Sequence, residues 1–321
     1  METITENRIE ELLPMSRAIE VVEQAFRDCA RGMIATGRRG TLEIDGSGGS
    51  CILLPARHKE SGFYSVKYAA SIPACSAQGL PTVQSVIWLF SARTGRACAM
   101  IEANALTAVK TGAASAVATR HLSNEHAGIL TVIGAGDQAR TQIAGISQVR
   151  ILTEIRLVDL DPDRSQALKS WVEKHLGTDI PVIAVSTAEK AVQGADIIVT
   201  CTTSMRPVLN GDHLSPGAHI NAIGGFTPQM QEIDLRTVLR ADKIVVDAAR
   251  EAWACSGDLI VPLKSGAIDK DLPMEELGNI VEETSLGRNA EQEITLYESV
   301  GFAPLDLAVA TAVYRQAVAS G

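Results

Sequence analysis

The sequence predicts an α/β protein made of two parts, and three observations indicate this. Residues 41–101 hold short β-favouring runs separated by Gly, Ser or Pro. From Gly128 onward apolar strands alternate with helical segments, which is typical of a parallel sheet with crossover helices. A glycine-rich turn, GAGDQA, joins the first of those strands to the first of those helices.

The N-terminal part begins with an amphipathic helix within residues 12–32. Its apolar residues recur at helical spacing: Ala18, Ile19, Val22, Ala25 and Phe26. Gly32 is a suitable stop. Strands are then expected at residues 41–44, 50–55, 63–71, 82–90 and 97–101. An Ala-rich helix should follow from Ala103 to about Leu122.

The second part continues with the alternating pattern. Its expected strands lie at residues 128–133, 154–159, 195–202, 219–224 and 243–247. Asp161 before Pro162 reads as a helix N-cap followed by the first helical residue. Ser186 with Glu189 reads as a capping box for a short helix.

These elements predict a domain inserted in another. Residues 125–300 should form the alternating domain. Residues 1–124 and 301–321 should form a smaller α+β domain. The last helix, roughly Pro304 to Ala319, is apolar enough to need a partner, and we expect it to return to that smaller domain.

The glycine-rich turn has the pattern of a dinucleotide-binding site. Gly134 permits a tight turn, Gly136 lets the backbone approach a pyrophosphate, and Ala139 allows close helix–strand packing. The helix N-terminus offers N–H groups to the anion. Asp159 ends the second strand, near the distance of about 20 residues at which an acidic residue binds ribose. Together these features predict a Rossmann domain, although such a turn also occurs without a ligand.

Asp159 favours NAD(H) over NADP(H), because a carboxylate accepts hydrogen bonds from ribose hydroxyls and repels a 2′-phosphate. Asp161 adds a second negative charge nearby. Two alternatives stay open. Asp159 can simply end a strand while Asp161 caps a helix, and Arg164 could reach a 2′-phosphate.

Bulk properties exclude several classes of function. The 321 residues carry a formal net charge of −9, which argues against nucleic acid or anionic membrane as a partner. No apolar run reaches the roughly 18 residues of a spanning helix, and the acidic N-terminus lacks a signal-peptide layout. Six cysteines without a CxxC pair favour a reduced, cytoplasmic setting. The six histidines show no ligand spacing, so no metal is expected.

Several segments together resemble one known family. LTAVKTGAASAVATRHL, GAGDQA and HINAIGGFTPQMQEID, with PTVQSVIWLF and YESVGFAPLDLAVA, resemble the ornithine cyclodeaminase/mu-crystallin proteins. The resemblance covers nearly the whole chain in the same order. It implies a Rossmann domain inserted in a substrate and dimerisation domain, a homodimer, and an active site between the two domains.

The resemblance also implies a substrate site. Arg39, Lys67 and Lys110 match positions that hold the carboxylate of an amino or imino acid, which charge-assisted hydrogen bonds bind strongly. Lys67 is the candidate for proton management. From the pattern alone, Lys67 could instead be a strand lysine that faces solvent. Lys110 stands where the family usually has Arg.

Further positions match residues that line the cofactor in the family, although each could serve ordinary packing. With the glycine-rich turn they are Thr82, Thr111, Gly134, Ala135, Gly136, Asp137, Gln138, Asp159, Thr200, Thr202, Ile223 and Val300.

Phe226 departs from the family, whose ornithine cyclodeaminases and alanine dehydrogenases carry an acid/base aspartate there. Members without an acidic residue at this place resemble ketimine reductases. The resemblance therefore implies an NAD(P)H-dependent reductase of cyclic imino acids, Δ1-pyrroline-2-carboxylate or Δ1-piperideine-2-carboxylate. An amino-acid dehydrogenase, an opine-type synthase and a mu-crystallin-like binding protein remain alternatives. Ornithine cyclodeaminase activity is disfavoured.

Overall fold

The computed structural model describes residues 1–44, 49–176 and 180–320. The chain divides into two compact units: unit 1 comprises Met1–Lys110 and Phe302–Gly321, and unit 2 comprises Thr111–Gly301. The division falls inside one continuous helix, α3 (Asn104–Leu122). The sequence placed a boundary after this helix, at residues 124/125, because a helix that runs on without a break does not reveal where its packing partners change.

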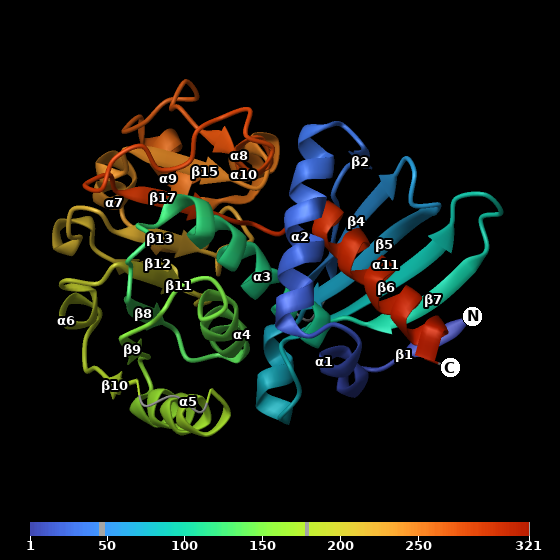
Figure 1. Cartoon of the computed structure of the whole chain (residues 1–321), viewed down its shortest axis with the longest axis horizontal. Helices are drawn as coiled ribbons and strands as arrows, with labels where there is room; N and C mark the ends of the chain where they lie inside the picture. The colour runs from blue at the N-terminus through green and yellow to red at the C-terminus, as the bar shows by residue number, and fades with distance from the viewer. Residues whose placement is uncertain (45–48, 177–179, 321) are drawn as a thin grey trace. The chain divides into compact units, whose positions relative to one another are not determined.

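Unit 1 contains a seven-stranded sheet in the order β1-β7-β6-β5-β4-β2, with β3 also paired to β4 (Figure 1). The pair β1–β7 is parallel and the other pairs are antiparallel. The strands are β1 (Glu2–Ile4), β2 (Ile34–Thr36), β3 (Gly40–Ile44), β4 (Gly49–His58), β5 (Phe63–Ser71), β6 (Val83–Ser91) and β7 (Ala97–Glu102). The sequence did not predict β1 or β2.

Two helices, α2 and α11, contribute buried apolar residues to the core of unit 1. Helix α2 (Met15–Ala30) buries the five apolar residues named above, and its C-terminal end is followed by Gly32 at φ 65°. Helix α11 (Ala303–Ser320) packs on α2 and lies across β4, β5 and β6 (Figure 1). Phe26 of α2 and Phe302, next to α11, stack with ring centroids 6.2 Å apart. The short helices are α1 (Ile9–Leu12), η1 (Glu6–Arg8) and η2 (Pro73–Gln78).

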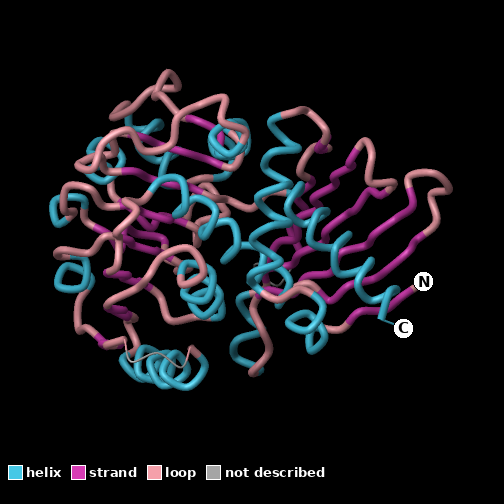
Figure 2. The backbone as a smooth tube through the Cα atoms, viewed as in Figure 1, coloured by secondary structure: helices cyan, strands magenta, loops and turns pink. Residues whose placement is uncertain are grey.

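Unit 2 contains an eight-stranded parallel sheet in the order β10-β9-β8-β11-β13-β17-β15-β16, drawn in magenta in Figure 2. Its strands are β8 (Ile129–Ile133), β9 (Glu154–Val158), β10 (Val182–Ala184), β11 (Ile197–Thr200), β13 (His219–Ala222), β15 (Lys243–Val246), β16 (Glu275–Glu276) and β17 (Thr295–Glu298). The chain order reverses between β8 and β11. Ligands of such sheets bind outside the carboxyl ends of the strands at this switch point.

The helices of unit 2 are α4 (Asp137–Ile146), α5 (Pro162–His175), α6 (Ala188–Val192), α7 (Leu235–Arg240), α8 (Ala249–Cys255), α9 (Gly257–Ser265) and α10 (Leu277–Val281), with η3 (Gly211–His213). A small parallel pair, β12 (Met205–Leu209) and β14 (Gln231–Ile233), lies outside the main sheet. Asp161 caps α5 through its side chain, as predicted. The cap of α6 is Thr187, and the prediction of Ser186 was wrong by one residue. The expected α/β fold class with a Rossmann sheet is confirmed.

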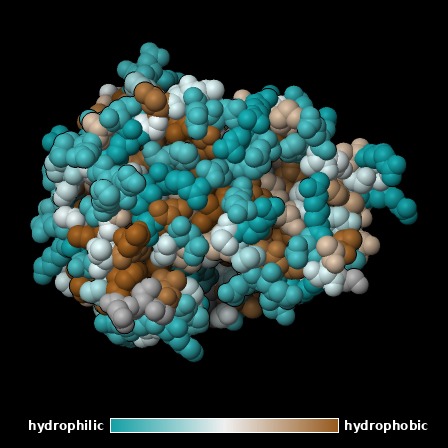
Figure 3. All heavy atoms as spheres, viewed as in Figure 1, coloured by the Kyte–Doolittle hydropathy of each residue, from teal (hydrophilic) through white to brown (hydrophobic). Residues whose placement is uncertain are grey.

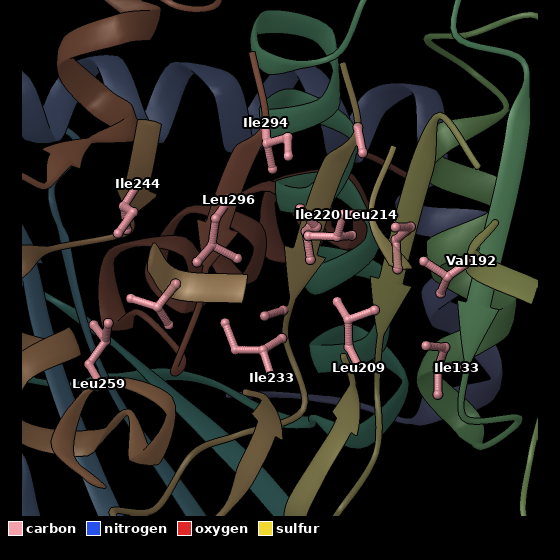
Figure 4. Close-up of a cluster of buried hydrophobic side chains, with 14 of the residues drawn as sticks. Ile133, Val192, Leu209, Leu214, Ile220, Ile233, Ile244, Leu259, Ile294 and Leu296 are labelled. Atoms are coloured by element: carbon pink, nitrogen blue, oxygen red, sulfur yellow. The ribbon is translucent and has the colours of Figure 1, made fainter. Parts of the chain in front are cut away.

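Apolar side chains from strands and helices of unit 2 converge in one core cluster (Figure 4). Ile133 and Ile220 reach it from the sheet, and Leu259 from α9. On the face of the molecule in Figure 3, hydrophilic residues cover most of the surface and apolar patches lie between them. Within the described residues, no helix is both long and apolar enough to cross a membrane.

Candidate active site

A cluster of buried charges lies in unit 1, and we call it the cationic cluster: Lys67, Thr107, Lys110 and Asp306. Lys67 on β5 donates through Nζ to Oγ1 of Thr107 at 2.7 Å and to Oδ1 of Asp306 at 3.2 Å. Lys110 Nζ lies 2.9 Å from the same Oδ1. Only 5% of Lys67, 3% of Lys110 and 1% of Asp306 is exposed. The structure therefore excludes a solvent-facing Lys67.

The burial of Lys67 follows from the pleat of β5. Ser65 and Lys67 point to the side that α11 covers, whereas Tyr68 is exposed on the other side. A lysine is almost never fully buried unless it is paired. The partner is Asp306, which α11 brings to β5 from 239 residues away in the sequence.

Burial lowers the pKa of Lys67 from 10.5 to about 8, and the positive charges of Lys110 and Arg39 act in the same direction. Asp306 opposes them through its charge and its hydrogen bond. Burial by itself raises the pKa of Asp306, but the two lysines outweigh it, so the pKa of this carboxyl is lowered. Two ammonium groups beside one carboxylate leave an excess of one positive charge, which suits an anionic ligand.

Arg39 is half-buried in the segment before β3, and its charge acts on Lys67. The three cationic residues expected from the sequence thus belong to one region of unit 1. The role of Asp306 was not predicted. The available signal was a lone acidic residue within the apolar segment FAPLDLAVA.

The glycine-rich turn in unit 2 joins β8 to α4, as its pattern predicts. Gly134 has φ 102°, a left-handed conformation that favours glycine. A Cβ on Gly134 would lie 2.8 Å from the carbonyl oxygen of Cys201, so the turn approaches the end of β11 closely. Gly136 is the N-cap of α4, and no side chain among the described residues caps this end. The first N–H groups of α4 are therefore suited to binding an anion.

Asp159 follows β9 and lies beside the same turn. Its Oδ2 accepts a hydrogen bond from the backbone N of Ala135 at 2.7 Å, and its Oδ1 accepts one from Asp161 N at 3.0 Å. Asp161 in turn accepts from Asp163 N and caps α5. The acidic residue and the glycine-rich turn thus form one connected edge at the carboxyl ends of β8 and β9.

Glu232 of β14 joins two neighbouring loops of that edge. It accepts hydrogen bonds from Thr200 Oγ1 at 3.0 Å, from Thr202 N and Oγ1 at 2.6 and 2.8 Å, and from Gly224 N at 2.6 Å. Burial raises the pKa of Glu232, although these hydrogen bonds favour the ionised carboxylate. The role of Glu232 was not predicted, because its partners lie at the end of β11 and in the loops after β11 and β13.

Asp258, at the start of α9, supports the position of Glu232. Its Oδ1 accepts from the backbone N of Glu232 at 2.8 Å and from that of Ile233 at 3.1 Å. Burial raises the pKa of Asp258 to about 7. Its Oδ2 lies 3.9 Å from the position of a Cβ on Gly225, so this carboxyl lies close to the turn that precedes Phe226.

The remaining predicted cofactor residues are less tightly grouped. Ile223 follows β13 and Val300 follows β17, and both are buried in unit 2. Thr111 begins unit 2, and its neighbour Gly112 packs against the backbone of Thr141 in α4. Thr82 is exposed in unit 1, just before β6. No group of three or more potential metal ligands occurs among the described residues.

The family of the chain follows from comparison with known proteins. The model of the ornithine cyclodeaminase/mu-crystallin family matches residues 2–321. The chain belongs to this family. A Δ1-pyrroline-2-carboxylate reductase of Bacillus thuringiensis subsp. konkukian (strain 97-27) is 31% identical over 321 residues, which is 100% of this chain and 98% of the relative.

Two solved structures of the ornithine cyclodeaminase/mu-crystallin family are similar over the whole chain. Thermococcus litoralis Δ1-pyrroline-2-carboxylate reductase, in complex with NADH and L-proline, has a TM-score of 0.96 and 34% identity, with 100% of this chain and 98% of that chain covered. An archaeal alanine dehydrogenase dimer with bound NAD has a TM-score of 0.92 and 31% identity, with 99% and 96% covered.

Proposed function

We propose that this protein is an NAD(P)H-dependent reductase of cyclic imino acids, converting Δ1-pyrroline-2-carboxylate or Δ1-piperideine-2-carboxylate to L-proline or L-pipecolate. It is an NAD(P)-dependent oxidoreductase acting on a CH–NH or C=N bond, like the relatives it matches. The observation that carries the proposal is the buried pair of ammonium groups, Lys67 and Lys110, in a chain so similar to a reductase that binds NADH and L-proline.

The cationic cluster is the proposed site of the substrate carboxylate. Lys67 and Lys110 supply ammonium donors, and Arg39 adds a guanidinium charge beside Lys67. In a buried site such charge-assisted hydrogen bonds are stronger than in water. They fix the orientation of a small ring that has few other polar groups.

The carboxyl edge of the unit 2 sheet fits a dinucleotide. Gly134 leaves no room for a side chain beside Cys201, the N-terminus of α4 is open to an anion, and Asp159 stands at the end of β9. Bound NADH supplies the hydride that reduces C2 of the C=N bond. We propose that NADH is preferred to NADPH, because Asp159 and Asp161 repel a 2′-phosphate.

Lys67 is the group that we propose for proton transfer. With a pKa of about 8 it is largely protonated at neutral pH, yet it can release a proton more readily than an exposed lysine. A protonated cyclic imine already accepts hydride well. Catalysis then depends mainly on holding the substrate in position, for which Lys67, Lys110 and Arg39 suffice.

Phe226 favours reduction over cyclodeamination. It is half-buried in the turn after β13, where ornithine cyclodeaminases carry an acid/base aspartate. A phenyl ring cannot transfer a proton. Reduction of a preformed cyclic imine involves no cleavage of a C–N bond and places less demand on an acid/base at this position.

An alanine dehydrogenase is the second candidate, because the archaeal alanine dehydrogenase shares the fold over the whole chain at 31% identity. Forming alanine from pyruvate requires ammonia addition and loss of water before hydride transfer. Phe226 makes these proton-coupled steps less favourable than reduction of a preformed imine.

We also propose a homodimer, formed through the outer face of the unit 1 sheet. Leu53, Tyr68 and Val86 stand opposite one another on β4, β5 and β6. Leu53 is 45% and Tyr68 38% exposed, and apolar rows of this kind are typical of an interface. Sedimentation of the wild type and of Tyr68→Glu tests this: the wild type should sediment as a dimer and the variant as a monomer.

The direct test of the activity is a substrate panel. NADH and NADPH oxidation is followed with each cyclic 2-imino acid and with pyruvate or other 2-oxo acids plus ammonia or an amine. We expect kcat/KM to be highest for a cyclic imino acid. A higher value for pyruvate with ammonia would instead establish the dehydrogenase, and absence of turnover with tight NADH binding would indicate a binding protein.

A further inference from the structure

The position of the Lys67 ammonium group is set by two acceptors on different elements. An ammonium has three N–H donors. One points to Thr107 Oγ1 on α3 and another to Asp306 Oδ1 on α11. Within the described part of the chain, the third donor is left for a ligand. The two acceptors belong to helices, so they fix the direction of that third donor.

The same carboxylate also holds Lys110. Asp306 Oδ1 lies 3.2 Å from Lys67 Nζ and 2.9 Å from Lys110 Nζ, so one oxygen bridges two like charges. The charged groups that act on Lys67 come from three elements around β5. They are Asp306 on α11, Lys110 on α3 and Arg39 before β3. Asp306 is the single negative charge among them, and it is buried.

Without a carboxylate at this place, two buried ammonium groups would face each other. Like charges in a buried site drive one of the groups to lose its proton or to turn away. Either outcome removes a donor from the proposed carboxylate site. Asp306 is therefore more than a packing residue of α11, because Lys67 and Lys110 both need its negative charge to stay protonated and in place.

We propose that Asp306 is a positioning residue of the substrate site: it keeps Lys67 charged and, with Lys110, aimed at the substrate carboxylate. This inference rests on the proposed function, since the ligand is the carboxylate of the imino acid. Asp306 itself does not contact the substrate. It acts through the two lysines.

Asp306→Asn is the mildest variant. Asp306 Oδ2 has no hydrogen-bond partner among the described residues, so the amide nitrogen can take its place while the amide oxygen still accepts from a lysine. Asp28→Asn is the matched control, because Asp28 is another carboxylate of unit 1, paired with His58 at 3.1 Å outside the cluster. Asp306→Glu restores the charge and should rescue part of the effect.

Two measurements are made on the full-length protein. The first is the titration of Lys67 by NMR with 13C-labelled lysine, in which Lys67→Arg identifies the resonance. The second is the pH dependence of KM and kcat for the cyclic imine. For Asp306→Asn we expect the midpoint of Lys67 to fall by about one pH unit. KM above pH 8 should rise about tenfold, since one unit is a tenfold change in protonation, with a smaller change in kcat.

Some outcomes would overturn the inference. An unchanged Lys67 midpoint and KM in Asp306→Asn, with only a lower melting temperature, would show that Asp306 is merely structural. If Asp306→Asn does not fold, Asp306→Asn with Lys110→Met keeps the net charge of the cluster. Because Asp306 acts on Lys67 more strongly than Lys110 does, the midpoint should still fall, and an unchanged midpoint would again contradict the inference. Absence of imine turnover in the wild type refutes the proposed function, whereas the NMR titration still tests Asp306.

Discussion

Asp159 Oδ2 lies 2.7 Å from the backbone nitrogen of Ala135, so the acidic residue after β9 directly holds the glycine-rich turn after β8. A residue expected to recognise ribose therefore also fixes the backbone that we expect to face the pyrophosphate. Its replacement should affect both the choice of cofactor and the affinity for either cofactor.

Asp159→Ser should relax the preference for NADH over NADPH. The variant removes a negative charge and a hydrogen-bond acceptor, and removing an acceptor so that its donor stays unsatisfied costs about 1–3 kcal/mol. The ratio of kcat/KM with NADH to kcat/KM with NADPH measures this preference. Asp161→Ser is the control, because serine retains the N-cap of α5 and should change the ratio less. A wild type that prefers NADPH would contradict the role given to Asp159.

Lys67→Ala should lower kcat/KM for the imino acid far more than Lys110→Arg. The first deletes one of two buried ammonium groups bound to Asp306, a change that typically costs about 2–5 kcal/mol of binding free energy. The second keeps the charge and restores the residue usual in the family. Steady-state kinetics decide the order. Near-normal turnover in Lys67→Ala would show that this lysine does not bind substrate.

The buried charge of Lys67 should lower the free energy of unfolding at neutral pH. The pKa of Lys67 is about 8 in the folded protein and close to 10.5 in the unfolded chain. Between these pH values the unfolded chain binds more protons than the folded protein. The contribution of Lys67 to the free energy of unfolding therefore increases as pH rises from about 8 to 10.5. Methionine is close in length to lysine and has no charge to desolvate, and in Lys67→Met the carboxylate of Asp306 keeps its ion pair with Lys110. Lys67→Met should therefore unfold at a higher urea concentration than the wild type at pH 7, although it should lose activity. Its advantage over the wild type should shrink above pH 8.

Glu232→Gln should weaken NADH binding more than it weakens the fold. The two carboxylate oxygens of Glu232 accept from Thr202 N and from Gly224 N, respectively. In glutamine one of these oxygens is replaced by an NH2 donor, so one bond is lost and the loops after β11 and β13 should separate. Asp196→Asn is the matched control. Asp196 accepts from the backbone N of Gly128 and of Ile129 at 2.8 Å each, at the amino end of the same sheet. Asp196 accepts both bonds through one oxygen, so the amide of Asp196→Asn can keep them and the NADH dissociation constant, measured by fluorescence, should stay unchanged. Glu232→Gln should raise it.

The protein should not convert ornithine to proline. That reaction breaks and forms C–N bonds between two hydride transfers, and a positioned acid/base typically contributes about 10²–10⁴-fold to such steps. Phe226 removes the aspartate that supplies it in the family. Ammonia and proline are assayed after incubation with ornithine and NAD. Ammonia release as fast as imine reduction would show that another group serves as acid/base, and the buried carboxyl of Asp258 lies close to this turn.

The local sequence was sufficient to predict the Rossmann part of the fold and its glycine-rich turn. The period of apolar residues changes at Gly128, glycine occurs where φ is 102°, and Asp161 caps α5. Each of these features depends on neighbouring residues alone, through backbone conformation and hydrogen bonds over a few positions. The cap of α6 shows where prediction from local sequence ends. Ser186 and Thr187 can both cap a helix, and only the backbone conformation in the structure identifies Thr187 as the cap.

The tertiary structure decided which charges meet. Nothing local distinguishes Lys67 from a strand lysine facing solvent, and Asp306 lies 239 residues further along the chain. Burial makes each of these groups unfavourable alone, so α11 and β5 are compatible only when their charges pair. Glu232 likewise accepts hydrogen bonds from Thr200 at the end of β11 and from Thr202 and Gly224 in the loops after β11 and β13. The sequence determined the glycine-rich turn because its geometry is local, whereas the cationic cluster exists only where distant segments pack together.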